Sequence, residues 1–427
     1  MNIDLAISVA IFVVSLFMVI KKPFRIDIGY SALIGALVTA VLGLITLDQV
    51  ITVLSIVWNA TLTFVSVVII SLIFDESGVF HHLALKLMKL SHGSGVRLFI
   101  YVIIGGAFIS AIFANDGTAL VLTPIIISLL SRAGFREKSI IAYVMAVGFI
   151  ADSASIPLLV SNLVNIIAAT YFGIAFFPYM EAMIFPDLVS IAASLTFLYI
   201  IYRKDIPKKF NSEHNVEEDY IRDRTVFRLF YPVITALIIL YSIGGFFSIP
   251  ISFVAMPMAL FMVLLSRRGK AIDYVKVVKE APWQIIIFSL GMYIVVFAMA
   301  EHGLASMLSS VLLYFSSYPY ALNFVISGFI FAFTASIMNN LPSVLLGDIA
   351  LKTGGFSGYI VLTNAIGNDI GPKFTPIGSL ATLVWLYMIK RKSGIKIRTV
   401  DYMKTGLFVG IPVLTLTLLS LWVETIL

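Results

Sequence analysis

The sequence predicts an all-α protein that crosses a membrane many times. Its 427 residues are 60% hydrophobic and only 12% charged, whereas about a quarter of the residues in a soluble domain are charged. Hydrophobic segments of about 20 residues, enough to span a bilayer as a helix, recur from one end to the other. Two of these segments carry polar residues and prolines at their centres, where lipid tolerates such groups only around a cavity or a bound solute. The fold class is therefore a polytopic helical bundle built around a buried polar site.

The hydrophobic segments fall into spans, short amphipathic pieces and interrupted stretches. Simple spans are expected near residues 5–20, 28–47, 55–74, 182–202, 226–246, 249–266, 282–299 and 405–426. Short amphipathic pieces are expected at 80–90 and 303–316, re-entrant hairpins with polar tips at 97–131 and 320–351, and discontinuous helices at 139–171 and 356–389. Each discontinuous helix contains proline, which removes a backbone donor and interrupts regular helix.

The positions of Lys and Arg predict the orientation of the chain. If both hairpins return to the side from which they entered, 27 of the 29 Lys and Arg residues lie in loops on one side. Cytoplasmic loops are rich in these residues, so we expect this side to be cytoplasmic. The prediction is a multi-pass protein of the cell (inner) membrane with both termini outside. The net charge of +6 follows from this orientation and indicates no nucleic-acid partner.

The same topology divides the chain into two inverted-topology repeats. Residues 1–202 and 226–427 would each contain five transmembrane helices and one re-entrant hairpin, in opposite orientations. The polar segment 203–225 would join them as a cytoplasmic linker. Carriers that work by alternating access are built from repeats of this kind, with a discontinuous helix in each.

Two matching spacings support the repeats. Trp58 precedes Gly78 by 20 residues, and Trp283 precedes Gly303 by the same number. A repeated tryptophan-to-glycine spacing is expected if one ancestral unit gave rise to both halves. The binding site would then lie where the halves meet, near the middle of the membrane.

The hairpin tips and the discontinuous helices supply the candidate site residues. The candidate substrate-binding residues are Asn115, Gly117, Thr118, Ser161, Asn162, Asn339, Asn340, Asn364, Asn368 and Thr375. The candidate proton-coupling residues are Asp116, Asp152, Asp369 and Lys373. Amides, hydroxyls and freed main-chain groups can bind a small hydroxylated solute, and a carboxylate at membrane depth can carry a proton. The alternative is that the tip residues only cap turns or hold the hairpins to the bundle.

Lys373 is expected to pair with a carboxylate, because a Lys inside the bilayer is costly. Its partner would be Asp369, or Asp116 from the other half. The pair could be purely structural. We favour a pair whose charge also takes part in proton coupling. The sequence does not choose between the two partners.

Enzymatic chemistry is not expected. The chain has no cysteine, which excludes disulfides and thiolate metal sites. It also lacks the His-Glu-x-x-His pattern of zinc proteases and a phosphate-binding loop of its own. We therefore expect a transporter with no cofactor and no resident metal.

Four segments resemble the ArsB-type arsenite efflux family of the ion transporter superfamily. They are FANDGTALVLTP, ADSASIPLLVSNLVNI, MNNLPSVLLG and GNDIGPKFTPIGSLATLVWL, and the similarity extends along most of the chain. The resemblance implies export of trivalent arsenite and antimonite in exchange for protons. In some members a soluble ATPase subunit drives export, and the basic loop 203–228 is where such a partner would dock here.

Other members of the superfamily are the nearest alternatives. A dicarboxylate carrier would show Ser-Asn-Thr at both hairpin tips, whereas this chain has Asn-Asp-Gly-Thr and Asn-Asn-Leu-Pro. A Na+/H+ antiporter stays open, because Asp116, Asp369 and Lys373 could serve that exchange.

Overall fold

The computed structural model describes residues 3–210, 220–269 and 271–426, apart from the side chains of Phe24, Asp116 and Lys392. Within these residues the chain is helical and contains no strand. Eight helices are long and apolar enough to cross a membrane. The predicted fold class, an all-α polytopic membrane protein, is confirmed.

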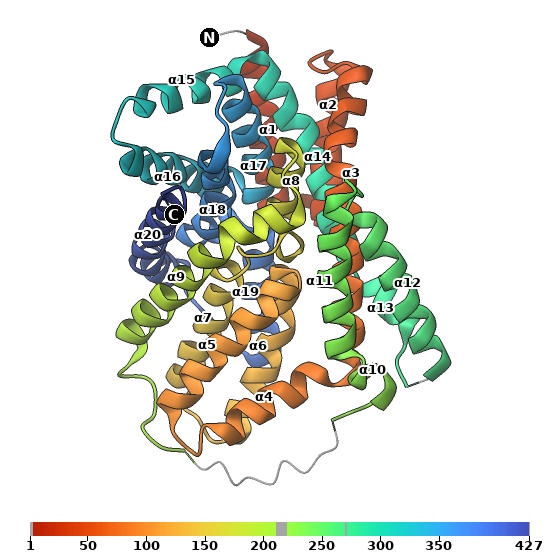
Figure 1. The fold of residues 1–427 in the computed structure, drawn as a ribbon, viewed down its shortest axis with the longest axis vertical. Helices are drawn as coiled ribbons and strands as arrows, with labels where there is room; N and C mark the ends of the chain where they lie inside the picture. Colours follow the sequence, from red (N-terminus) through yellow and green to blue (C-terminus); the bar gives the residue numbers. More distant parts are fainter. Residues whose placement is uncertain (1–2, 211–219, 270, 427) are drawn as a thin grey trace.

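The described residues of the first half of the chain form nine α-helices, whose arrangement is shown in Figure 1. They are α1 (Ile3–Lys21), α2 (Ile28–Val41), α3 (Leu47–Ser77), α4 (Val79–Leu90), α5 (Gly95–Ile112), α6 (Asn115–Arg132), α7 (Glu137–Ser153), α8 (Leu163–Phe172) and α9 (Phe176–Tyr202). The 3-10 turns η1 (Pro23–Arg25) and η2 (Leu159–Ser161) lie between them.

Eleven α-helices follow in the part of the second half that the structure describes. They are α10 (Arg224–Arg228), α11 (Phe230–Phe246), α12 (Ser252–Gly269), α13 (Tyr274–Glu280), α14 (Trp283–Met299), α15 (Ala305–Ser316), α16 (Tyr320–Met338), α17 (Asn340–Thr353), α18 (Leu362–Ile370), α19 (Leu380–Ser393) and α20 (Thr399–Glu424). A π-helical turn η3 (Ala300–Leu304) and the 3-10 turns η4 (Gly358–Val361), η5 (Gly371–Phe374) and η6 (Pro376–Gly378) complete it.

Each polar-tipped stretch is a pair of helices joined by a very short tip. In the first pair, α5 ends at Ile112 and α6 begins at Asn115. In the second, α16 ends at Met338 and Asn339 takes φ 78 before α17 begins at Asn340. Asn tolerates positive φ better than most residues. In Figure 1 the α5–α6 pair lies toward one end of the molecule and α16–α17 toward the other.

Both predicted helix interruptions occur. The chain leaves α7 after Ser153 and resumes helix only at Leu163, with η2 between. It leaves α18 after Ile370 and passes through η5 and η6 before α19. Pro157, Pro372 and Pro376 lie in these gaps and prevent a continuous helix. The breaks place main-chain groups and polar side chains inside the bundle.

Two neighbouring predicted boundaries are wrong, the end of the second span and the start of the third. The predicted spans 28–47 and 55–74 are α2, which ends at Val41, and α3, which has 31 residues and begins at Leu47. Thr46 accepts a hydrogen bond from the Gln49 amide, and the Gln49 side chain accepts one from the Thr46 amide. This capping box starts the helix early.

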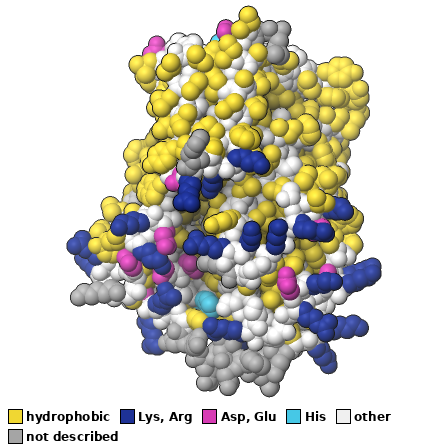
Figure 2. Space-filling view, turned by 180° about the vertical axis from the view of Figure 1, so that it is seen from behind, with side chains coloured by type: hydrophobic (Ala, Val, Ile, Leu, Met, Phe, Trp, Pro, Cys, Tyr) yellow, Lys and Arg dark blue, Asp and Glu magenta, His cyan; other side chains and the backbone are white. Residues whose placement is uncertain are grey.

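The described ends of the segment 203–225 pack onto the first half of the chain. The Phe210 amide donates to the Gly93 carbonyl at 2.8 Å, and the Arg222 amide donates to the Ser77 carbonyl at 3.0 Å. Nearby, Glu76 pairs with Arg222 at 2.7 Å and with Lys276 at 2.9 Å. On the face in Figure 2, Lys and Arg gather over the lower half while the upper part is mainly hydrophobic.

Close helix packing around the second interruption depends on glycine. A Cβ at Gly406 of α20 would overlap the carbonyl oxygen of Lys373 in η5. At Gly244 of α11 the nearest atom would be the Ile249 Cβ at 3.7 Å, an ordinary contact. A glycine-to-alanine substitution would therefore clash with backbone at Gly406 but fit without a clash at Gly244.

We expect Gly406→Ala to destabilise the protein by about 1–3 kcal/mol, because a close-packed backbone cannot yield without strain. Gly244→Ala is the matched control and should be neutral or slightly stabilising, since Ala favours helix over Gly. Thermal unfolding of the detergent-solubilised variants measures both. Equal melting temperatures for the two would contradict the packing described here.

Candidate substrate and coupling site

The two discontinuous helices meet at one hydrogen bond. Asn162, between η2 and α8, donates from Nδ2 to Asp369 Oδ1 of α18 at 2.5 Å, across 207 positions of sequence. Both side chains are buried. Asn162 is held in place because its Oδ1 caps α8 by accepting from the Val164 amide at 3.1 Å. The contact joins the two halves of the chain at their polar centres.

Each hairpin tip bonds to the discontinuous helix of its own half. At the first tip, Asn115 Nδ2 donates to Asp152 Oδ1 at 3.1 Å. At the second, Asn339 Nδ2 donates to the Ile377 carbonyl at 3.3 Å. Thr375 adds a second link there, because its hydroxyl donates to the Ser336 carbonyl at 2.6 Å. The four polar segments picked out by sequence therefore form one connected site.

Lys373 lies at the centre of this site and is fully buried. Its ammonium interacts electrostatically with the carboxylates of Asp152, Asp369 and Asp187. Its Nζ makes no hydrogen bond to any described atom. No ion pair within 4.0 Å joins Lys373 to a described carboxylate, so its interaction with Asp369, the predicted partner, acts at longer range. The other predicted partner, the side chain of Asp116, lies outside the described part of the structure.

Some predicted residues serve the local shape of the interruption. Ser161 donates to the carbonyls of Ser155 and Leu158 at 2.5 and 2.6 Å, so its hydroxyl closes the turn of η2. Thr118 donates to the Ala114 carbonyl at 3.3 Å, within the first tip. A Cβ at Gly117 would be 3.8 Å from Ser71 Oγ, which leaves room beside this tip.

The remaining predicted amides lie in the second half. Asn340 is buried at the start of α17. Asn364 and Asn368 lie one turn apart on α18 and are joined by a 2.7 Å hydrogen bond from Asn368 Nδ2 to Asn364 Oδ1. Asn364 in turn donates to Asp348 Oδ1 at 2.8 Å.

The sequence reasoning missed two buried carboxylates. Asp187 follows Pro186 inside α9, is 4% exposed and interacts electrostatically with Lys373. Asp348 lies in α17 and is fully buried. Each is the only acidic residue of its predicted membrane segment, 182–202 or 320–351, and that isolation is the available signal.

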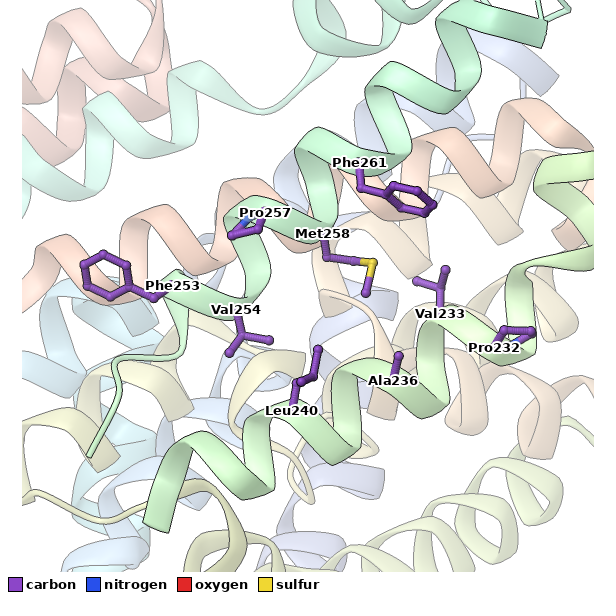
Figure 3. A pocket seen from close by; sticks show the side chains of 9 residues that line it. All are labelled: Pro232, Val233, Ala236, Leu240, Phe253, Val254, Pro257, Met258 and Phe261. Carbon is purple, nitrogen blue, oxygen red and sulfur yellow. The ribbon is translucent and has the colours of Figure 1, made fainter. Parts of the chain in front are cut away.

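A surface groove between α11 and α12 is not part of this site (Figure 3). It encloses about 510 Å³ and is lined by Pro232, Val233, Ala236, Leu240, Phe253, Val254, Pro257, Met258 and Phe261. Every one of these side chains is apolar. Phe253 and Phe261 are 62% and 49% exposed, as expected of side chains that face lipid. Such a groove offers nothing to recognise a polar solute.

The chain matches a known family along nearly its whole length. Residues 7–425 match the family described as arsenical pump membrane protein. The chain belongs to this family. Arsenical pump membrane proteins of Escherichia coli (strain K12) and Yersinia enterocolitica are 42% and 41% identical to it. In both cases the match covers 96% of this chain and 97% of the relative.

A solved structure shares the fold of this arsenical pump family member. The YdaH transporter of Alcanivorax borkumensis, described as having an unusual topology, superimposes with a TM-score of 0.56. The match covers 88% of each chain at 12% sequence identity, so it concerns the fold alone. Membership of the family and eight candidate spans make the chain a multi-pass membrane protein.

Proposed function

We propose that the protein exports trivalent arsenite and antimonite from the cytoplasm in exchange for protons, by alternating access. The observation that carries the proposal is the convergence of both hairpin tips and both discontinuous helices around Lys373, through Asn162, Asp369, Asn115 and Asp152. The side chains of this site suit both the proposed solute, arsenite, and the proposed coupling ion, the proton.

The solute fits the donor set. Arsenite near neutral pH is largely an uncharged trihydroxide, which amides, hydroxyls and main-chain groups can bind by hydrogen bonds. The chain has no cysteine, so thiolate ligation is not available to it. Oxygen and nitrogen contacts also allow release, because three sulfur ligands would hold the metalloid too tightly for turnover.

The coupling ion fits the buried charges. Asp152, Asp187 and Asp369 face one ammonium, that of Lys373, and buried carboxylates of membrane proteins commonly serve proton relays. In the cycle we propose, the inward-facing site holds deprotonated Asp369 or Asp116 and accepts the solute. One half then moves against the other, the solute leaves outside, and a proton binds the carboxylate and drives the return.

Alternating access requires two comparable halves, and several features support a 1–202 and 226–427 division. Gly78 after α3 and Gly303 after α14 both take positive φ, at 93° and 114°. Each is followed by a short helix, α4 or α15, and then by a helix pair with a polar tip. We also propose that the basic side around 203–225 is cytoplasmic, that both termini lie outside, and that any ATPase subunit docks on loop 203–228.

The test is arsenite uptake by everted vesicles that contain the purified protein, with an imposed proton gradient that is acid inside. We expect uptake that collapses with a protonophore and is unaffected by sodium. Empty vesicles under the same gradient are the control. Sodium-evoked proton movement without arsenite uptake would replace this function by Na+/H+ exchange.

A further inference from the structure

Asp348 is a buried carboxylate that the proposed cycle does not use. It lies in α17 and has no exposed surface. No ion pair joins it to a described Lys, Arg or His residue, and Lys373 does not act on it. The nearest cation along the helix, Lys352, lies 5.1 Å above the ring of Tyr171. An ionised carboxylate without a counter-charge is costly at such a place.

Two amides connect Asp348 to the central site. Asn364 Nδ2 donates to Asp348 Oδ1 and to the Val344 carbonyl, each at 2.8 Å. Its Oδ1 accepts from Asn368 Nδ2 at 2.7 Å. The Val344 carbonyl fixes the direction of the Asn364 amide, and a Cβ at Gly347 would overlap that amide. Asn368 precedes Asp369 in sequence, so the hydrogen-bonded row of Asp348, Asn364 and Asn368 ends one residue from the contact between the two halves.

Three oxygens in this region lack a described hydrogen-bond partner. They are Asp348 Oδ2, Asn368 Oδ1 and the Tyr293 hydroxyl, and all three side chains are fully buried. Tyr293, on α14, interacts electrostatically with Asp348. A proton on Asp348 Oδ2 would remove the buried charge and turn this unpartnered acceptor into a donor.

The described charged and titratable groups around Asp348 include none that neutralises its carboxylate, so a proton is the simplest ligand for it. Around α17, Tyr293 lies on α14, Tyr171 on α8, and Glu301 and His302 on η3. Asp369 is on α18, and Lys352 is on α17 itself. Helices α15 and α16 contain no Asp, Glu, Lys, Arg or His. No described cation therefore neutralises Asp348.

We propose that Asp348 is a second proton-binding site of the transporter, in the half of the molecule that carries α16 and α17. This rests on the proposed function. A proton from water outside forms the O–H bond of the Asp348 carboxyl. The same proton returns to water on the cytoplasmic side when the site faces inward, and the carboxylate is restored. The Asn364–Asn368 row lets the central site respond to this change.

Infrared difference spectroscopy of the protein in liposomes, titrated with pH, tests the site without any transport. We expect a protonated-carboxyl band that is lost in Asp348→Asn and shifted in Asp348→Glu. The glutamate variant decides the assignment if the asparagine variant does not fold. A band that is unchanged in the variants, or that sodium abolishes in the unmodified protein, would overturn the proposal.

Transport measurements then test the coupling role. Without a proton gradient, Asp348→Asn should still exchange arsenite across the vesicle membrane. With an imposed proton gradient, its arsenite uptake should be no higher than without the gradient. Asp48→Asn, at the exposed start of α3, is the matched control and should behave like the unmodified protein. Full gradient-driven uptake by Asp348→Asn would refute the role. If the unmodified protein carries no arsenite, the proposed function fails, and the infrared result still decides whether Asp348 binds a proton.

Discussion

Lys373→Gln is expected to remove both stability and transport. The ammonium is fully buried and acts on Asp152, Asp187 and Asp369. Removing one partner of a directly paired buried charge costs about 3–5 kcal/mol, because the other charge is left uncompensated. No described carboxylate lies within 4.0 Å of this ammonium, so that range is the upper bound of the expected loss. That is a large share of the stability of a typical domain, about 5–15 kcal/mol. Thermal unfolding in detergent and arsenite uptake in vesicles measure the two losses.

Double variants identify the carboxylate that depends on Lys373. Lys373→Gln is combined in turn with Asp152→Asn, Asp187→Asn and Asp369→Asn. The pair with the strongest coupling should recover the most stability, since the second change removes the stranded charge. Lys352→Gln is the control, because Lys352 is exposed on α17. Normal stability and uptake in Lys373→Gln would show that this ammonium has no part in the site.

The parts of the site that could be predicted from the sequence are those marked by nearby residues, such as a proline or a polar residue in an apolar run. Pro157, Pro372 and Pro376 interrupt helices wherever they stand, so the two discontinuous helices could be placed from the sequence. Asn115 and Asn339 stand where apolar runs reverse, and both occur at helix-pair tips. The overall class followed from composition alone.

What sequence could not provide are contacts between distant elements. The hydrogen bond from Asn162 to Asp369 spans 207 positions, and nothing local at either residue specifies it. Asp187 approaches Lys373 only because α9 packs beside the first interruption and α20. The start of α3 differs from the prediction because the capping box at Thr46 begins the helix eight residues before the predicted span.

Asp369→Asn is expected to abolish proton-coupled export while the protein still reaches the membrane. Asparagine has nearly the same shape as aspartate, and its carbonyl oxygen can still accept the hydrogen bond that Asn162 now donates to Asp369 at 2.5 Å. The amide cannot bind and release a proton at neutral pH. The Asp369→Asn variant should therefore still bind the solute but lose the coupling of its transport to protons. Gradient-driven arsenite uptake and the amount of protein in the membrane are the two measurements.

Asp116→Asn, at the first tip, should likewise abolish proton-coupled export while the protein still reaches the membrane; this prediction rests on the sequence, since the Asp116 side chain lies outside the described structure. The exposed Asp48→Asn variant shows what the same chemical change does away from the site. If Asp369→Asn and Asp116→Asn both export normally, neither is the coupling group. The charge change would then have to occur at another buried carboxylate. Asp152 and Asp187 face Lys373, and Asp348 is joined to the site through Asn364, so the same substitution at these three positions would locate it.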